Sequence, residues 1–162
     1  MLFVLYNTNR YIYSGTISID NNEISLVDIL IASDEIELIE VYKQLEKRLL
    51  ENESAWKLPK DFITLCQHHD HFTNLYEVAI ELVCKTPKVI FESKKFLKME
   101  EDHLIRLLKC DDLKLEEIEI WEYLIKWEIE NTDSILNDDI NKWISINFME
   151  LKETLYNCIP YI

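Results

Sequence analysis

Three of the four histidines and one cysteine stand together in the run Cys66-Gln67-His68-His69-Asp70-His71. Thiolate and imidazole are ligands that zinc accepts, and Cys66 and His69 would share one face of a helix. A structural zinc site needs four ligands, usually two pairs separated by a loop, and a second pair is missing. We therefore favour a polar helix end, where histidines face the negative pole of the helix dipole, and we expect no metal.

Carboxylates are abundant, with 31 Asp and Glu residues against 17 Lys and Arg, so paired acids carry little information. Glu122 and Lys126 stand four residues apart and would support a helix rather than serve as an acid–base pair. Cys84 is followed by Lys85, which could lower the pKa of its thiol, but no matched histidine stands in a recognisable motif. We expect a core cysteine, no catalytic residues and no enzymatic activity.

The composition excludes several classes of function. One glycine in 162 residues is too few for phosphate-binding or dinucleotide-binding loops, which need two or three. A net charge of −14 argues against a nucleic-acid partner, because phosphate binding needs a basic face. We therefore expect no cofactor and no nucleic acid.

The cysteines and the N-terminus bear on the cellular compartment. Cys66, Cys84, Cys110 and Cys158 are widely spaced and form no C-x-x-C pair. The apolar residues 1–6 lack a basic flank and are too few for a signal sequence, and no apolar run approaches the roughly 20 residues of a membrane helix. We expect a cytoplasmic or nuclear protein that is not secreted and has no membrane partner. Its four cysteines should be reduced and mostly buried, although an even count leaves two disulfides open.

Hydrophobic spacing predicts a mainly α chain with one small β element at its front. Alternating apolar residues predict a strand over residues 11–19, which contains the single glycine, Gly15. A helix with Leu26, Ile29 and Leu30 on its buried face should follow. A second helix should bury Ile36, Ile39, Tyr42, Leu45 and Leu49.

From residue 52 onward the pattern predicts a series of short helices. Pro59 suits the first turn of a helix that reaches His68, and Thr86-Pro87 separates a helix over 72–85 from a short one that ends at Ser93. Further helices are expected over 100–109, 116–131 and 147–157. The buried stripe of the 72–85 helix should consist of Phe72, Leu75, Tyr76, Ala79 and Val83.

Tryptophans supply much of the expected core. Trp121, Ile125 and Trp127 form apolar bulk in the 116–131 helix, and we interpret them as core residues. Trp56 and Trp143 stand beside expected helix starts, where they could anchor either the packing or a partner.

A distinct pattern of spaced residues runs through the second half of the chain. It consists of Phe96-Leu97-x-Met99, then Leu104-x-x-Leu107-Leu108-x-x-Asp111-Asp112-Leu113-x-Leu115-Glu116-Glu117-x-x-Ile120, then Leu124-x-x-Trp127. This pattern resembles the BACK domain, a helical module that follows BTB domains in kelch-type and related proteins.

The first half of the chain extends the resemblance. Residues 52–85, with Trp56 and Phe62, resemble the helix pair that joins a BTB domain to a BACK domain. Three earlier segments resemble the last strand and the last two helices of a BTB domain. They are Tyr11-Ile12-Tyr13-Ser14-Gly15-Thr16-Ile17, Leu26-Val27-x-Ile29-Leu30-x-Ala32-x-Asp34-Glu35 and Leu45-x-x-x-Leu49. We expect residues 1–51 to be the C-terminal part of a BTB domain. Residues 52–162 would be the linking helix pair and a C-terminally incomplete BACK domain, in a truncated member of the kelch-like or BTB–TLDc adaptors.

The resemblance implies a non-enzymatic protein-interaction module of the kind that serves as substrate adaptor in cullin-RING ubiquitin ligases. The partner would be a cullin scaffold protein, docked in an apolar groove between two helices. The candidate residues for that groove, here called the predicted docking residues, are Phe62, Leu65, Phe72, Leu75 and Tyr76. The same five side chains could instead pack the helix pair together, and both interpretations stay open.

The missing front of the BTB domain limits what the resemblance implies. We do not expect the family's homodimer, because the dimer-forming part is absent, and we expect residues 1–51 to be poorly packed. Two alternatives to a ligase adaptor are a scaffold or regulatory protein unconnected with ligases and a non-functional truncated product. The sequence does not identify a substrate.

Overall fold

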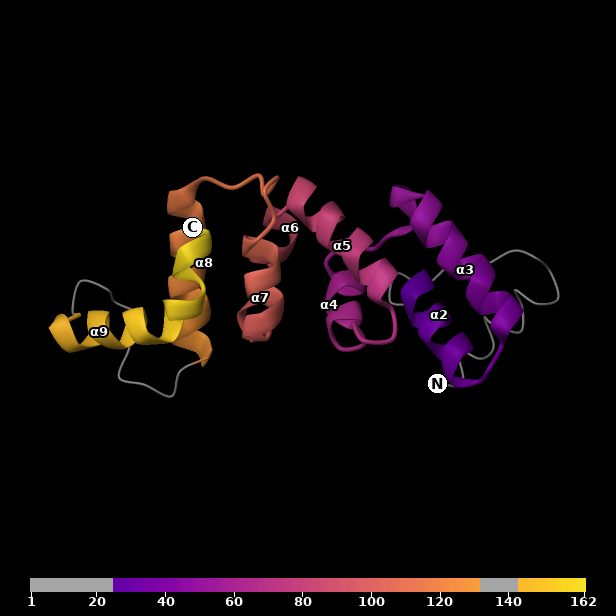
Figure 1. Ribbon diagram of the computed structural model, residues 1–162, viewed down its shortest axis with the longest axis horizontal. Helices are drawn as coiled ribbons and strands as arrows, with labels where there is room; N and C mark the ends of the chain where they lie inside the picture. The colour runs from indigo at the N-terminus through magenta and orange to yellow at the C-terminus, as the bar shows by residue number, and fades with distance from the viewer. Residues whose placement is uncertain (1–24, 132–142) are drawn as a thin grey trace. The chain divides into compact units, whose positions relative to one another are not determined.

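The computed structural model describes residues 25–131 and 143–162, and all the regular structure in these ranges is helical (Figure 1). The chain is therefore mainly α, as hydrophobic spacing predicts. The strand expected over residues 11–19, with Gly15, lies outside the described residues. The chain divides into two compact units, residues 1–79 and 80–162.

The first unit is built on two consecutive helices, α2 (Leu26–Glu35) and α3 (Ile39–Glu51). Helix α2 contacts both α3 and the short helix α4 (Lys60–Cys66), and Leu30 of α2 and Leu45 of α3 are fully buried. The expectation of poor packing is therefore wrong for residues 25–51, because the two helices cover each other's apolar faces.

The buried face of α3 differs from the predicted one. Val41, Leu45 and Leu49 are buried, whereas Ile36 is 41% exposed and Ile39 is 60% exposed. Glu37 adopts a positive φ of 57° between the two helices, so the helical phase is reset there. The prediction is wrong for Ile36 and Ile39 because it carried one periodicity across this turn.

The 3₁₀ turn η1 (Glu53–Ala55) leads from α3 to α4, and α5 (Thr73–Lys85) follows. Pro59 stands at the N-cap of α4, where its missing N–H costs no hydrogen bond. The whole predicted stripe of α5 is buried. The helix ends where Pro87 begins α6 (Lys88–Phe91), as the Thr86-Pro87 pair predicts.

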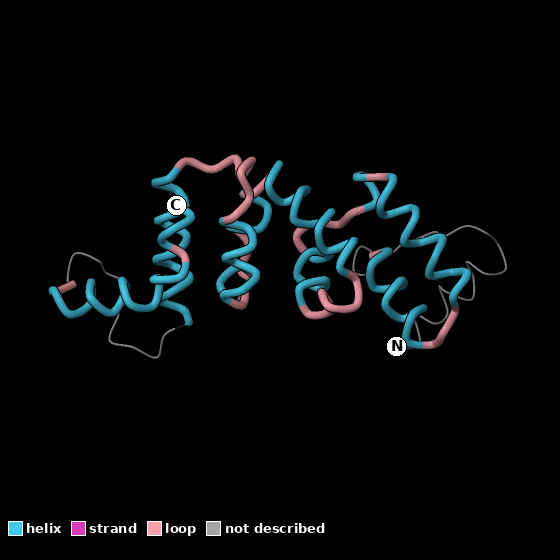
Figure 2. Tube along the Cα trace, in the orientation of Figure 1, coloured by secondary structure: helices cyan, strands magenta, loops and turns pink. Residues whose placement is uncertain are grey.

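The second unit continues with short helices (Figure 2). These are the 3₁₀ turn η2 (Phe96–Lys98), α7 (Glu101–Leu108), α8 (Glu117–Asn131), α9 (Ser145–Thr154) and the 3₁₀ turns η4 (Leu155–Asn157) and η5 (Ile159–Tyr161). Helix α8 packs on η2 and contacts α9, and fully buried Leu104, Leu107 and Leu124 contribute to the core.

Tryptophans tie distant segments together within each unit. The indole Nε1 of Trp127 donates a hydrogen bond to the carbonyl oxygen of Met99 at 2.8 Å, and that of Trp56 donates to the carbonyl oxygen of Leu49 at 2.9 Å. The core interpretation is confirmed for Trp127, whereas Trp121 and Ile125 are only half-buried. Trp143 is buried as well.

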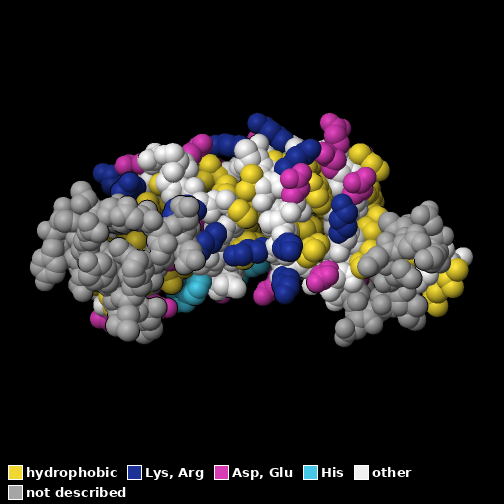
Figure 3. Space-filling view, turned by 180° about the vertical axis from the view of Figure 1, so that it is seen from behind, with side chains coloured by type: hydrophobic (Ala, Val, Ile, Leu, Met, Phe, Trp, Pro, Cys, Tyr) yellow, Lys and Arg dark blue, Asp and Glu magenta, His cyan; other side chains and the backbone are white. Residues whose placement is uncertain are grey.

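The surface mixes charged and apolar side chains. The face seen from behind carries Lys and Arg, Asp and Glu, and apolar side chains (Figure 3). Among the described residues, no helix combines the length and the apolar character needed to span a membrane.

Candidate protein-interaction site

The predicted docking residues lie on or next to α4 and α5, and all five are buried. Phe62, Leu65 and Leu75 are fully buried, and Phe72 and Tyr76 are at most 6% exposed. The rings of Phe62 and Tyr76 stack with centroids 6.1 Å apart, and Phe72 lies 6.2 Å from the ring of Tyr42 on α3. These side chains therefore pack the helix pair internally, and their contact with a partner stays a prediction.

The accessible surface of the helix pair comes from neighbouring positions. Ile63 on α4 and Val78 on α5 are half-buried apolar residues, and Thr73 and Asn74 at the start of α5 are exposed. These side chains reach the surface of the pair. The predicted docking residues would then contribute indirectly, by fixing how α4 and α5 pack against each other.

A polar network joins the starts of α2 and α4. Ser25 and Asp28 form a capping box: the Ser25 N–H donates to Asp28 Oδ2 at 2.8 Å, and the Asp28 N–H donates to Ser25 Oγ at 3.2 Å. Asp28 also accepts a hydrogen bond from Lys60 Nζ at 2.5 Å, and Asp61 accepts one from the Lys57 N–H at 2.6 Å. The sequence carries a signal for only part of this network, the Ser-x-x-Asp spacing before an apolar helix.

Asp61 is the acid of this network with the most unusual environment. Its side chain is fully buried, and its Oδ1 has no hydrogen-bond partner. Burial raises the pKa of its carboxyl above the ordinary value, although the Lys57 N–H and the Ser25 hydroxyl act in the opposite direction. The folded protein therefore binds this proton more tightly than the unfolded chain does.

We expect Asp61 to lower the free energy of unfolding as pH rises. Between its ordinary pKa and the raised value of the folded state, the folded form holds the proton and the unfolded form releases it, so stability falls with rising pH. In Asp61→Asn this dependence should disappear. Urea unfolding of both proteins at a series of pH values measures it as the difference between the two curves. A difference that is independent of pH, or that grows in favour of the wild type as pH rises, would show that burial does not dominate.

The histidine run forms a helix end and the loop that follows it. The Nδ1 atom of His69 lies 3.2 Å from the carbonyl oxygen of Cys66, and its Nε2 lies 3.2 Å from the Asp70 carboxylate. The rings of His68 and His71 lie against Phe72. Within residues 25–131 and 143–162, no three His, Cys, Asp or Glu side chains are grouped to hold a metal ion.

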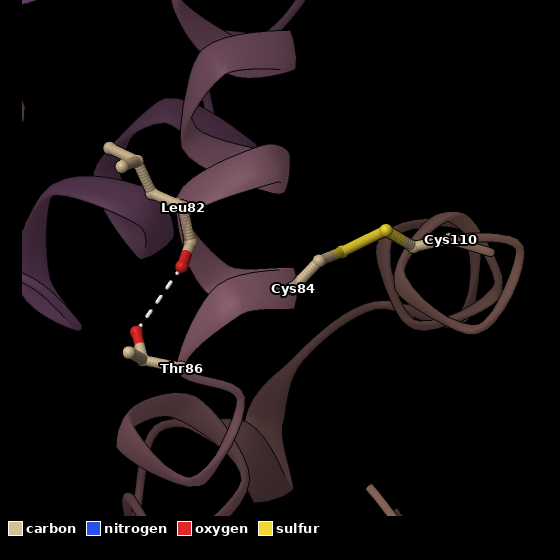
Figure 4. Close-up of a disulfide and its surroundings, with 4 residues drawn as sticks. All are labelled: Leu82, Cys84, Thr86 and Cys110. Carbon is tan, nitrogen blue, oxygen red and sulfur yellow. Dashed lines mark hydrogen bonds between the residues drawn. A yellow bond between two sulfur atoms is a disulfide. The ribbon is translucent and has the colours of Figure 1, made fainter. Parts of the chain in front are cut away.

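Cys84 and Cys110 are joined by a disulfide in the second unit (Figure 4). Their Cα atoms are 6.6 Å apart, and the bond links α5 to the residues that follow α7. The Cys84 carbonyl oxygen also accepts a hydrogen bond from the Lys114 N–H at 3.2 Å. The expectation of four reduced cysteines is wrong for this pair, because two thiols 26 residues apart in sequence are brought together only by the fold.

The other two cysteines, Cys66 and Cys158, are not disulfide-bonded and are buried, as expected. Burial raises the pKa of the Cys158 thiol to about 11, and the nearby carboxylates of Glu101 and Glu128 contribute in the same direction. Cys158 therefore stays protonated at neutral pH, where a thiol is a poor nucleophile.

Helix α9 exposes large apolar side chains that the sequence interpretation did not single out. Its buried face is narrow: Asn147 is buried, and its Oδ1 accepts a hydrogen bond from the Ile144 N–H at 2.9 Å. The exposed side chains around α9 include Ile144, Ile146, Phe148 and Met149, each more than half exposed.

The segment from α4 to α8 carries the buried residues of the spaced pattern, including Phe96, Leu104 and Trp127. Residues 61–138 match the model of the BACK family, described as "BTB And C-terminal Kelch". The match likens residues 61–138 to a non-enzymatic, adaptor-type interaction domain. The BACK match starts at the first turn of α4 and leaves out residues 1–60, so the BTB helices stay a prediction. No curated protein and no solved structure matches the chain.

Proposed function

We propose that this protein is an adaptor-type interaction module that binds a cullin scaffold of a ubiquitin ligase through the α4–α5 helix pair. The observation that carries the proposal is the BACK match over residues 61–138, which begins within this pair. Docking of a helix or an extended segment against two packed helices needs a rigid platform with accessible apolar side chains. The stacked Phe62 and Tyr76 rings supply the rigidity, and Ile63 and Val78 supply apolar surface.

The assigned roles follow from burial. The predicted docking residues would set the spacing and angle of the two helices, and a cullin segment would lie on the half-buried residues around them. Such an adaptor would work in the cytoplasm or nucleus. It would contribute binding and no catalytic step.

The test is binding of the full chain to purified cullin N-terminal domains, with Val78→Glu as the disrupting variant. A carboxylate at this half-buried apolar position should lower the affinity by about tenfold or more, since a charge at the centre of an apolar contact loses its hydration. Val89→Glu is the matched control, because Val89 lies on α6 and is 41% exposed. Thermal melting of both variants confirms that they fold.

The possible outcomes separate the two classes of function. Binding that Val78→Glu weakens and Val89→Glu spares would support the proposal. If the folded wild type binds none of the cullin domains, the ligase role is wrong and a ligase-independent scaffold is favoured. Equal losses in both variants would overturn the assignment to α4 and α5.

A further inference from the structure

Positive charge is concentrated in one short stretch of this acidic chain. Residues 85–98 contain five lysines and one glutamate, whereas the whole chain has a net charge of −14. Lys94, Lys95 and Lys98 are exposed, and none of them forms an ion pair with another described residue. These lysines lie on and around η2, in the second unit.

A pocket of about 400 Å³, here called the aromatic pocket, adjoins these lysines. Phe91 and Phe96 are buried and pack against Tyr123 with ring centroids between 4.7 and 6.0 Å apart, so they form the floor of the pocket. The half-buried Leu97 and Tyr123 supply its accessible apolar lining. Lys94 and Lys126 line it as well, and Lys126 Nζ lies 5.4 Å from the centroid of the Tyr123 ring. Apolar wall and cationic side chains therefore meet at one opening.

Hydrogen bonds fix the two sides of the aromatic pocket to each other. Asn131 Nδ2 donates to the carbonyl oxygen of Leu97 at 2.5 Å, and Trp127 Nε1 donates to that of Met99. Both bonds join α8 to the η2 segment. The Phe96 N–H donates to Ser93 Oγ at 3.3 Å, which orders the turn between α6 and η2. A pocket formed before binding costs little ordering entropy when a ligand enters.

Glu92 is the one carboxylate among the lining residues of this pocket. Burial, followed by the charge of Glu92, raises the pKa of Tyr123, so its hydroxyl stays protonated. Glu92 would repel an acid at its own side of the opening. Acidic groups of a ligand are therefore directed to the side of Lys94 and Lys126.

We propose that the aromatic pocket binds an acidic peptide segment of a partner protein, with one large apolar side chain of the segment packed on the half-buried Leu97 and Tyr123. Its flanking carboxylates would pair with Lys94 and Lys126. A volume of about 400 Å³ accommodates one such side chain. Charge complementarity supports this choice of partner, since an acidic segment is repelled elsewhere on a chain of net charge −14 and attracted here. The site is distinct from the proposed cullin-docking helices and does not depend on them.

The probe is a short fluorescein-labelled peptide with one central phenylalanine flanked by aspartates and glutamates, and binding to the full chain is followed by fluorescence anisotropy. Replacing the central phenylalanine of the peptide by alanine should weaken binding by about tenfold or more, because burial of such a ring contributes roughly 1.5–3 kcal/mol. Raising the salt concentration should weaken it further, since exposed charges are screened.

The variants of the protein are Lys94→Glu alone and Lys94→Glu combined with Lys126→Gln. Glutamine is chosen at position 126 because a carboxylate there would stand four residues from both Glu122 and Glu130 on α8 and weaken the helix. The combined variant should lose about tenfold in affinity for the probe. Lys152→Glu is the matched control, an exposed lysine on α9 in the same unit, and it should leave the affinity within about twofold.

Three results would overturn the proposal. One is the absence of saturable binding by the phenylalanine peptide, and another is equal affinity for the alanine peptide. The third is an equal loss in Lys152→Glu, which would show that net charge alone controls binding. Tighter binding of a polyphosphate chain than of the peptide would assign the lysines to phosphate instead. Self-association of the wild type that is lost in the combined variant would assign the pocket to a second copy of this chain. Either of these two results would show that an acidic peptide is not the ligand.

Discussion

Replacement of Phe62 by alanine is expected to lower the free energy of unfolding by about 3–5 kcal/mol. Its ring is fully buried between α4 and α5 and stacks on Tyr76, so truncation leaves a cavity that the surrounding helices fill only in part. Urea unfolding followed by far-UV circular dichroism measures the loss.

Ile39→Ala is the informative control for Phe62→Ala. Ile39 lies on α3 in the same unit, and its side chain is 60% exposed. Its truncation should change the free energy of unfolding by less than about 1 kcal/mol, because little apolar area is returned to water. Equal effects of the two substitutions would contradict the packing described for α3, α4 and α5.

Removal of the Cys84–Cys110 disulfide is expected to have the second large effect. Replacement of both cysteines by serine should lower the free energy of unfolding by about 3.5 kcal/mol under oxidising conditions. That figure is the loop-closure entropy of a bond between residues 26 apart in sequence. In dithiothreitol, where the wild type also lacks the bond, most of the difference should vanish.

Thiol titration gives an independent reading of the same bond. Cys66 and Cys158 are not disulfide-bonded, so the denatured, unreduced wild type should show two reactive thiols and the reduced protein four. Four thiols without reduction, or a stability difference that persists in dithiothreitol, would show that the pair is not bonded in solution. A bond of this kind is uncommon in the cytoplasm, so its state also bears on the proposed location.

Much of the helical order could be predicted because strong local signals mark its boundaries. Pro59 and Pro87 stand at helix starts, where a missing N–H costs nothing, and the structure begins α4 and α6 there. The stripe of α5 was predictable for a similar reason. A helix that buries one face throughout keeps a single periodicity, and Leu75, Ala79 and Val83 follow it.

The errors arose where the outcome depends on the path of the chain in three dimensions. The positive φ of Glu37 resets the helical phase, and a non-glycine residue gives no warning of such a turn. Four widely spaced cysteines allow three full pairings as well as partial ones, so nothing local favours Cys84 with Cys110. Asp61 is one of 31 acidic residues, and only the packing of α4 distinguishes it by burying it.

The aromatic pocket shows the same limit. Phe96 belongs to the spaced pattern of the sequence, but its packing with Phe91 and Tyr123 beside Lys94 and Lys126 depends on the docking of η2 on α8. The five lysines of residues 85–98 gave rise to no expectation, because the chain as a whole is strongly acidic. The sequence does not show the apolar pocket that lies beside these lysines in the fold.

The tryptophans are unevenly distributed between the two units, so one of them can serve as an intrinsic fluorescence probe of the first unit. Trp56 is the single tryptophan of residues 1–79, whereas Trp121, Trp127 and Trp143 belong to residues 80–162. The buried indole of Trp56 is held by the Leu49 carbonyl, so its emission reports the local environment of the first unit. A chain in which the other three are phenylalanine would have an emission spectrum that follows this unit alone, with no dye attached.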